Sequence, residues 1–439
     1  MALARLGAML VPLNWRLAPA EHAWILGDCA PRLVIAEPEF QPGIDSIRAS
    51  LSPALYVSLG AAAPGWQAWE SMGGQSCNAG GAGGAGGDAD DLLIVYTSGT
   101  TGRPKGAVLT QNALLWNGYN SIHAHDLQQN DHVLSALPMF HVGGLNNQTL
   151  PALQTGASVT LHRRFEPGAW LADVAALKPT LSLLVPATLA AVIRHPDWPS
   201  TDLSSLRLLN TGSSVVPETL IRAFHARGVQ VGQIYGATET APIAVVLLRQ
   251  DAGTHVGSAG KPALHCAVRI VDGDGRDLPA EQIGEVWVRG PNVMRAYWND
   301  PQATRAAFHE GWFKTGDLAR CDRHGYFWIA GRSSDLIISG GENIYPAELE
   351  NVLADCAAIA EYAVVGIADA RWGEAACACV VKKPGAALDA DGVLALFIDR
   401  LAKFKHPRRI AFFDCLPKSA LGKVQKFELK QLVERGTVN

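Results

Sequence analysis

The sequence lacks the cysteine spacings of a redox or zinc site. Its eight cysteines are scattered, and the closest pair, Cys377 and Cys379, is separated by a single residue. A C-x-x-C redox pair and the usual zinc motifs need a longer spacing. The N-terminus also lacks the long apolar core of a secretion signal. We therefore predict reduced thiols and a cytoplasmic location.

The chain is also poor in charge of one sign and in long apolar runs. Its 37 basic and 41 acidic residues give a net charge of -4 and a pI near 6.4, so nothing attracts nucleic acid or anionic lipid in general. The longest uncharged stretch, residues 132–162, contains prolines and asparagines that a membrane-spanning helix tolerates poorly. We predict a protein with no nucleic acid partner and no integral membrane association, in which any anion site is local.

One such local site is present at residues 96–106, which read Tyr-Thr-Ser-Gly-Thr-Thr-Gly-Arg-Pro-Lys-Gly. The segment follows an apolar run, and its small residues let backbone N–H groups face an anion while a lysine supplies charge. The common G-x-x-x-x-G-K-[ST] phosphate loop is excluded because Gly106 follows Lys105. The sequence predicts a different triphosphate cradle, built from Thr97, Ser98, Gly99, Thr100, Thr101, Gly102 and Lys105.

These eleven residues resemble the signature of the adenylate-forming, or AMP-binding, superfamily, and the resemblance continues almost to the C-terminus. Within it, the chain is most similar to the acyl-CoA synthetase and acid–CoA ligase branch. The resemblance implies that ATP, Mg²⁺ and CoA are used with a carboxylic acid substrate, and it leaves a homodimer open.

The pattern of elements predicts an α/β fold with more than one domain. A chain of 439 residues exceeds what one core usually organises. Short apolar runs alternate with helical patterns up to about Gly331, which is typical of α/β layers. We expect a large, multi-subdomain α/β domain over residues 1–332 and a small, mobile α+β lid over residues 333–439, with a helix over about residues 391–403. A low-complexity tether is expected at residues 78–88.

A second motif, residues 233–240, reads Gln-Ile-Tyr-Gly-Ala-Thr-Glu-Thr and follows an apolar strand. Ligands bind at strand ends in α/β sheets. The resemblance implies that Tyr235 stacks on adenine beside Gly236, that Thr238 contacts phosphate, and that Glu239 holds Mg²⁺, a hard cation that requires oxygen ligands.

Two further segments complete the implied nucleotide site. Residues 211–214 match the place where the family lines the adenine pocket, although the match is loose and an ordinary strand-to-helix turn is the alternative. Asp317 would accept from the ribose hydroxyls, and Arg332 would reach the ribose or phosphate. The implied pocket residues here are Gly212, Ser213 and Ser214.

Near the C-terminus, residues 417–426 match the last motif of the family and imply that Lys423 lies at the carboxylate and the α-phosphate. An ammonium group there would stabilise the charge that spreads over the transferring phosphorus. The resemblance further implies that the lid rotates and presents Gly341 and Glu342 to a thiol. The usual pivot, Asp or Lys, is Ser334 here, so we expect altered hinge energetics.

The acid itself is less defined by the sequence. By the resemblance, His141 stands where amino-acid-activating relatives carry a Phe-Asp pair whose carboxylate binds the substrate amine, so a fatty or aromatic acid is expected, with His141 as an aromatic gate. o-Succinylbenzoate is an alternative, because segments 257–262 and 334–336 resemble its ligases. Two other readings stay open: an adenylation domain that loads a carrier protein, and a nucleotide-binding remnant without turnover. The remnant hypothesis follows from the resemblance, in which relatives begin with a helix and a strand and Met1 falls inside that helix. Either the true start lies upstream, or the first subdomain is incomplete and is expected to expose apolar surface.

Overall fold

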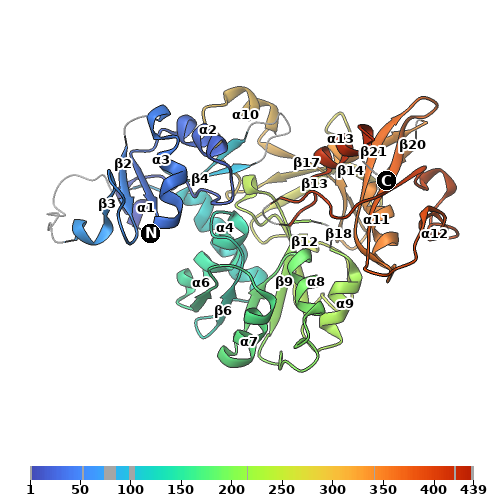
Figure 1. The fold of residues 1–439 in the computed structure, drawn as a ribbon, viewed down its shortest axis with the longest axis horizontal. Helices are drawn as coiled ribbons and strands as arrows, with labels where there is room; N and C mark the ends of the chain where they lie inside the picture. Colours follow the sequence, from blue (N-terminus) through green and yellow to red (C-terminus); the bar gives the residue numbers. More distant parts are fainter. Residues whose placement is uncertain are drawn as a thin grey trace.

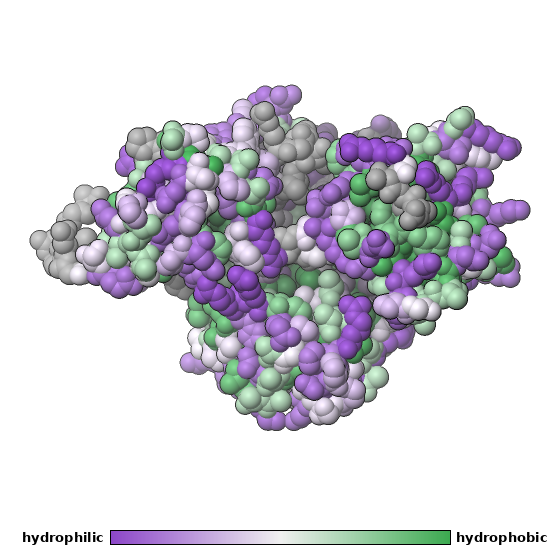
Figure 2. Space-filling model, viewed as in Figure 1, coloured by the Kyte–Doolittle hydropathy of each residue, from purple (hydrophilic) through white to green (hydrophobic). Residues whose placement is uncertain are grey.

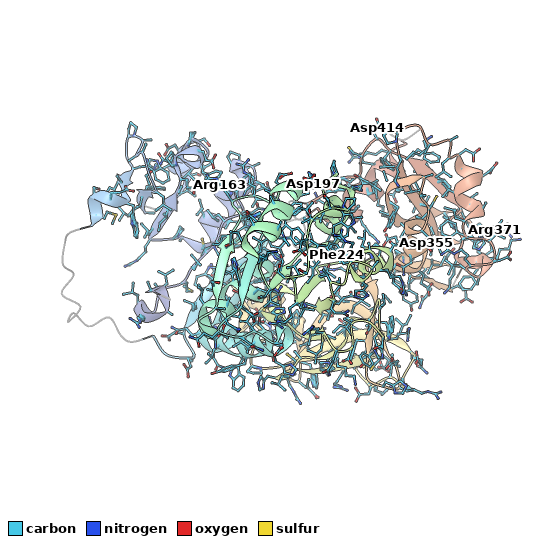
Figure 3. All side chains as sticks on the ribbon, turned by 90° about the horizontal axis from the view of Figure 1, so that it is seen from below. Arg163, Asp197, Phe224, Asp355, Arg371 and Asp414 are labelled. Atoms are coloured by element: carbon cyan, nitrogen blue, oxygen red, sulfur yellow. The ribbon has the colours of Figure 1, made fainter. Side chains whose placement is uncertain are left out.

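The computed structural model describes most of the chain, and its elements form three regions that follow one another in sequence (Figure 1). The described residues are 2–51, 54–73, 86–97, 104–214, 216–340, 342–419 and 422–436. In Figure 3, Phe224 marks the interior of the central region, while Asp355, Arg371 and Asp414 mark the C-terminal region at the far end.

The central region is built on a seven-stranded sheet in the order β12-β11-β10-β9-β8-β6-β7. The five strands from β10 to β7 are parallel, and β11 is antiparallel to β10. Parallel strands need helical crossovers, which cover both faces and make the strands apolar throughout. The strands are β6 (His132–Ser135), β7 (Ser158–Leu161), β8 (Leu181–Leu183), β9 (Leu208–Gly212), β10 (Val231–Tyr235), β11 (Val245–Leu247) and β12 (Lys261–Pro262).

Helices on the two faces of this sheet bury separate cores. One face packs against α7 (Pro167–Leu177), α8 (Pro186–Arg194) and α9 (Glu218–His225), with Trp170 and Phe224 fully buried. The other face packs against α4 (Gln111–His125) and the run α5 (Val142–Gly144), η4 (Leu145–Thr149) and α6 (Leu150–Thr155). The middle part of this run, η4, is π-helical.

The N-terminal region contains a parallel sheet of β1 (Leu33–Ala36), β2 (Leu55–Ser58) and β3 (Gln67–Ala68), with α1 (Ala2–Leu6), α2 (Pro19–Cys29) and α3 (Gln41–Asp45). Large apolar side chains are exposed here, among them Leu6 at 65 % and Ile35 at 46 %. Hydrophobic and hydrophilic residues are interspersed over the face drawn in Figure 2.

Two antiparallel sheets bring distant segments to the central region. β4 (Asp91–Thr97) and β5 (Lys105–Thr110) form a hairpin that β15 (Ala296–Tyr297) joins, and α10 (Pro301–Ala307) follows. The second sheet orders β13 (Ala267–Val271), β14 (Ile283–Arg289), β17 (Trp312–Cys321) and β16 (Phe308–His309), and β18 (Phe327–Arg332) pairs with β17.

After Arg332, a short 3-10 turn, η6 (Ser333–Asp335), leads into the C-terminal sheet in the order β20-β19-β22-β21, with β23 beside β22. Its two faces hold separate apolar clusters, one packed by α11 and one by α13. The elements are β19 (Ile337–Ser339), β20 (Glu342–Ile344), α11 (Pro346–Ala354), β21 (Ile359–Asp369), β22 (Gly373–Lys382), α12 (Ala390–Ala395), β23 (Arg409–Phe412) and α13 (Lys426–Glu434).

The α/β class of the fold is confirmed, whereas one predicted helix is shorter than expected. A helix was expected over residues 391–403, but α12 ends at Ala395 and turns follow. Asp399 adopts a left-handed backbone with φ of 60°, which interrupts a right-handed helix. Most of the predicted tether, residues 78–85, lies outside the described residues.

No helix within the described parts of the chain combines the length and the apolar character needed to cross a bilayer.

Candidate active site

Three predicted nucleotide-binding side chains meet at the carboxyl end of β10. The Tyr235 hydroxyl donates to Asp317 Oδ2 at 2.9 Å, and Arg332 Nε lies 3.3 Å from Asp317 Oδ1. β17 and β18 place Asp317 directly opposite Arg332. Burial raises the pKa of the Asp317 carboxyl, while the guanidinium of Arg332 opposes that shift. A buried carboxylate with a cation and a phenol beside it is suited to accept hydroxyl donors.

Lys423 reaches this group from the C-terminal region. It lies on a tight hairpin in which Ser419 N donates to Lys423 O at 2.8 Å, and a bridge joins Lys418 and Val424. The side chain keeps an exposed surface, yet desolvation by surrounding protein lowers its pKa, and the charge of Arg332 lowers it further. Asp317 and Asp335 oppose this shift. The predicted catalytic lysine therefore lies within electrostatic reach of the predicted ribose carboxylate.

The hairpin rests directly on the central region. Gly422 has φ of 76°, and a Cβ built there would lie 3.1 Å from Ala187 Cβ at the start of α8. A side chain at position 422 would be strained by the backbone angle and crowded by α8. Gly422 thus permits the close approach that carries Lys423 into the site.

His141 caps the helical run that begins with α5. Its Nδ1 accepts the Gly143 N–H at 2.9 Å, so a neutral ring carries its proton on Nε2. Burial lowers the pKa of His141 to about 4, and the positive charge of Lys423 contributes. His141 is therefore a neutral hydrogen-bond donor near the lysine.

The described ends of the phosphate loop lie beside Glu239. β4 and β5 pair Thr97 with Lys105, and Lys105 Nζ lies 5.3 Å above the Tyr297 ring. The Tyr297 hydroxyl donates to Glu239 Oε1 at 2.8 Å. The loop cation and the predicted metal ligand thus share one tyrosine. The loop residues Ser98, Gly99, Thr100, Thr101 and Gly102 lie outside the described residues.

The loop ends are also held by the N-terminal region. The Tyr96 hydroxyl donates to Asp28 Oδ2 at 2.6 Å, and Trp24 Nε1 donates to Pro104 O at 3.4 Å. Trp298 Nε1 donates to Asp28 O at 3.2 Å. The C-terminal end of α2 therefore positions both ends of the loop, a contact that the sequence motifs do not signal.

The remaining predicted pocket residues differ in their exposure to solvent. Gly212 ends β9, and Ser213 and Ser214 follow it as exposed residues. Ser213 has φ of 76°, a strained angle for a residue with a side chain and one that is concentrated at functional sites. Thr238 is buried at the start of η5 (Thr238–Thr240). Packing alone requires glycine at position 236, because a Cβ there would lie 1.7 Å from Pro242 O.

Glu342 is not brought to this cluster. It is exposed on β20, opposite Ser339, and within the described residues no hydrogen bond or ion pair joins it to Asp317, Arg332 or Lys423. Gly341 lies outside the described residues.

A buried polar layer on the opposite face of the sheet was missed in the sequence. Three α4 side chains spaced four residues apart face η4. Asn117 Nδ2 donates to Asn146 O at 2.9 Å, Ser121 Oγ donates to Asn147 O, and His125 Nε2 lies 3.0 Å from Asn147 O. A four-residue spacing of polar residues is the only signal, and it is equally typical of a solvated helix face.

Comparisons with known proteins agree with this geometry. Residues 1–298 match the model of the AMP-binding enzyme family, and residues 348–423 match that of the AMP-binding enzyme C-terminal domain. The indoleacetate–CoA ligase of Aromatoleum aromaticum is 51 % identical over 99 % of this chain and 86 % of its own. The feruloyl-CoA synthase of an Amycolatopsis species is 40 % identical over 98 % of this chain and 85 % of its own.

Among solved structures, the anthranilate CoA ligase AuaEII in complex with anthranoyl-AMP superposes with a TM-score of 0.90 at 29 % identity, covering 99 % of this chain and 84 % of its own. The chain belongs to the adenylate-forming, AMP-binding enzyme superfamily, in its acid–CoA ligase branch.

Proposed function

We propose that this ligase activates an aromatic monocarboxylic acid with ATP and transfers the acyl group to CoA. One observation carries the proposal: Lys423 of the C-terminal hairpin lies within electrostatic reach of Asp317 and Arg332, at the end of β10. The proposal draws its aromatic acid from the substrates named for the indoleacetate and feruloyl relatives.

In the first step, an oxygen of the substrate carboxylate attacks the α-phosphorus of ATP, and the bond to the pyrophosphate leaving group breaks. A carboxylate is already ionised at neutral pH, so positioning and charge neutralisation matter more than a general base. Lys423 would stabilise the charge on the transferring group, and Tyr235, Asp317 and Arg332 would hold the nucleoside. His141 would donate from Nε2 to an oxygen of the acid or the phosphate.

The residues near the loop fit a magnesium ion bound mainly by nucleotide phosphates. The described residues contain no group of three or more His, Cys, Asp or Glu side chains of the kind that forms a protein-only metal cage. Glu239 supplies one carboxylate, and Mg²⁺ in nucleotide enzymes is commonly held by one or two carboxylates together with phosphates. When bound, the ion would neutralise phosphate charge, and Tyr297 would orient Glu239 toward it.

In the second step, the CoA thiolate attacks the acyl carbonyl and AMP leaves. The present arrangement supports an assignment to the first step, since Lys423 lies within electrostatic reach of Asp317, whereas Glu342 is exposed on β20. We propose that residues 333–439 then rotate about η6, with Ser334 as the pivot. Ser334 Oγ donates only to the neighbouring Asp335, at 3.3 Å, among the hydrogen bonds of the described residues.

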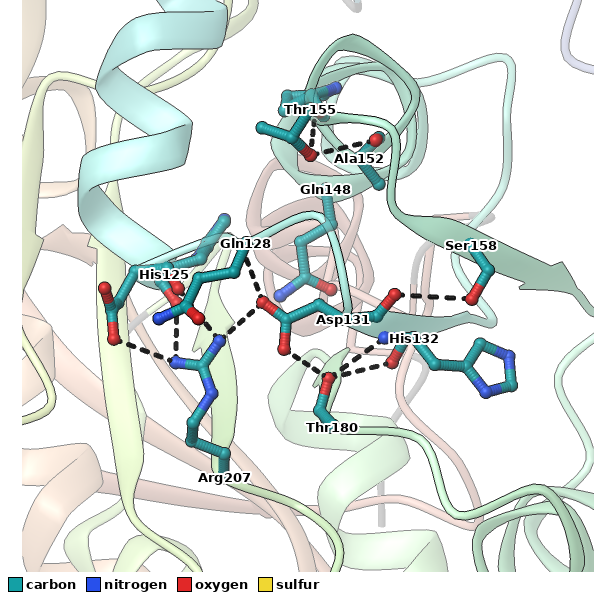
Figure 4. A network of polar contacts seen from close by, with 12 residues as sticks. His125, Gln128, Asp131, His132, Gln148, Ala152, Thr155, Ser158, Thr180 and Arg207 are labelled. Atoms are coloured by element: carbon teal, nitrogen blue, oxygen red, sulfur yellow. Dashed lines mark hydrogen bonds and ion pairs between the residues drawn. The ribbon is translucent and has the colours of Figure 1, made fainter.

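A dicarboxylate such as o-succinylbenzoate is a less favourable substrate. The polar side chains between α4 and η4 are amides, hydroxyls and a histidine whose pKa burial lowers to about 4. The cation near His125, Arg207, is already paired with Asp131 at 2.7 Å (Figure 4), so a second carboxylate placed there would be buried without a free cation, which is costly. This argument supports a monocarboxylic acid.

The direct test is to incubate the protein with ATP, Mg²⁺ and a panel of aromatic, fatty and dicarboxylic acids. Pyrophosphate release would be measured first, and CoA consumption second. We expect release with aromatic acids and thioester formation with free CoA. A lack of pyrophosphate with every acid would reject the proposal, whereas adenylation with little use of free CoA would favour a carrier-protein-loading role.

A further inference from the structure

The chain turns sharply after β10, and this turn carries two of the predicted site residues, Thr238 and Glu239. We call residues 236–243 the β10 turn. Ala244 N donates to Tyr235 O at 3.0 Å, so the chain returns to the end of β10 as soon as the turn is complete. The place of Glu239 beside the nucleotide cluster therefore depends on how this turn is held.

One buried side chain, Asn292, holds the far end of the β10 turn. Its Nδ2 donates to Thr240 O at 2.6 Å and to Ile243 O at 2.8 Å, which uses both amide hydrogens. Its Oδ1 accepts from the Cys266 thiol at 3.2 Å. Asn292 has no exposed surface, so water cannot replace these bonds. An amide suits this place because it combines two donors with an acceptor.

The segment that carries Asn292 also contacts Glu239 directly. Met294 N donates to Glu239 O at 2.7 Å, and the Tyr297 hydroxyl donates to Glu239 Oε1 at 2.8 Å. Asn292 fixes the carbonyl of the next residue, Thr240. Three contacts from one short segment therefore determine both the position of Glu239 and the direction of its carboxylate.

This segment is itself fixed on two sides. Arg295 N donates to Val108 O at 2.9 Å, and β15 pairs with β5, the strand that begins at the loop lysine. Gly290 lies against the amide, because a Cβ there would be 2.6 Å from Asn292 Oδ1 and 2.9 Å from His265 O. The Asn292 amide is thus packed from behind and cannot follow the turn if the turn moves.

We infer that Asn292 is a positioning residue for the first step of the reaction, and that it acts through the β10 turn on Glu239. This inference rests on the proposed function, because it takes Glu239 to be a ligand of Mg²⁺ at the nucleotide phosphates. Without Asn292, the carbonyls of Thr240 and Ile243 lose their donors in a buried place, and the turn must move to satisfy them. Glu239 would then shift relative to Tyr297.

A second buried asparagine provides a matched control. Asn120 also has no exposed surface, and its Nδ2 lies 3.5 Å from the same thiol, Cys266 Sγ. Its Oδ1 accepts from His265 N at 2.9 Å. Among the hydrogen bonds of the described residues, none joins Asn120 to the β10 turn. Asn120 and Asn292 share residue type, burial and a neighbouring thiol, and they differ in whether they reach the turn.

The first test measures metal binding without turnover. Mn²⁺ replaces Mg²⁺, and α,β-methylene-ATP, which cannot release pyrophosphate, replaces ATP. The electron paramagnetic resonance signal of free Mn²⁺ then gives the Kd of the bound ion. We expect Asn292→Ala to raise this Kd by about tenfold or more, since the outer partners of metal ligands commonly contribute roughly 10- to 100-fold. Asn120→Ala should leave the Kd close to that of the wild type.

A double-mutant cycle with Glu239→Gln separates positioning from general damage. The glutamine keeps an oxygen ligand and removes the charge, so we expect it to raise the Kd. Adding Asn292→Ala to Glu239→Gln should then change the Kd little, because residues that act through one another are not additive. An Asn292→Ala effect of the same size in both backgrounds would overturn the inference, and so would an equal rise in Asn120→Ala.

Activity provides a second readout. Asn292→Ala should raise the Mg²⁺ concentration needed for half-maximal pyrophosphate release, while thioester formation from supplied acyl-adenylate should change far less, because the pyrophosphate has already left. If Asn292→Ala does not fold, as judged by its thermal melting curve, Asn292→Ser keeps one donor and should shift the Kd in the same direction by less.

The outcomes distinguish this inference from the proposed function. An unshifted Kd in the Asn292 variants would overturn the inference and leave the ligase activity intact. An unshifted Kd in Glu239→Gln would refute the metal role of Glu239, and the inference with it. A wild-type protein that releases no pyrophosphate with any acid would instead refute the proposed function.

Discussion

The two faces of strands β9 and β10 carry different kinds of polar side chain. On the nucleotide face, charged groups meet: Asp317, Arg332 and Lys423 lie within electrostatic reach of one another. On the α4 face, the polar side chains of α4 and η4 are uncharged, and several of their buried amide atoms lack hydrogen-bond partners. Charge suits the triphosphate that every reaction of this family shares.

The largest effect on activity is expected when Lys423 is removed. We expect Lys423→Ala to slow adenylation by at least about 100-fold, because an ammonium group at developing phosphoryl charge acts mainly in the transition state. Thioester formation from supplied acyl-adenylate should change far less. Pyrophosphate release and CoA consumption, measured separately, provide the check. An equal loss in both steps would contradict the assignment of Lys423 to the first.

The buried His125 on the α4 face should make the free energy of unfolding depend on pH. The folded pKa of His125 is about 4, below its ordinary value of 6.5, so the unfolded chain binds more protons between these values. Stability from this group is therefore complete above about pH 6.5 and declines as pH falls toward 4, by at most about 3 kcal/mol.

Urea unfolding at pH 7 and pH 5 measures this decline. His125→Gln retains a donor for Asn147 O and does not titrate in this range, so its stability should fall less between the two pH values. A decline of the same size in the variant would show that other groups, such as His141, account for it.

Replacing the Asp317 carboxylate by a neutral amide should weaken the binding of ATP. We expect Asp317→Asn to raise the KM for ATP by about 10- to 100-fold, since a hydrogen bond to a charged group contributes about 1.5–3 kcal/mol. The KM of the acid should change much less, because Asp317 belongs to the nucleoside side. A larger effect on the acid than on ATP would contradict the separation of the two faces.

The smallest effect is expected at Tyr297, which contacts both the loop lysine and Glu239. Tyr297→Phe keeps the ring beneath Lys105 and removes the 2.8 Å hydrogen bond to Glu239. A neutral-to-charged bond at a half-exposed site suggests about 1 kcal/mol, or roughly a fivefold rise in the Mg²⁺ concentration needed for half-maximal rate. An unchanged Mg²⁺ dependence would separate Glu239 from the metal.

Some elements were predictable from sequence because local chemistry decides them. The strands before the phosphate loop and before Tyr235 are short apolar runs followed by small residues, and both form as β4 and β10. The helix expected over residues 391–403 could not be bounded in this way, because no composition signal marks the left-handed turn at Asp399. Nor does any motif indicate that Trp24 and Asp28 reach across to the loop ends.

The sequence by itself determined the family, the nucleotide chemistry and the identity of the charged residues, because charged groups at an anion site must be of a particular type and their motifs are local. Only the tertiary structure decided the neutral polar layer on the α4 face. Asn117, Ser121 and His125 would read as a solvated stripe on an isolated helix, and they become buried only because the π-helical η4 presents its carbonyls to α4. Such a contact depends on packing between segments that are more than 20 residues apart, and that packing has no local signature.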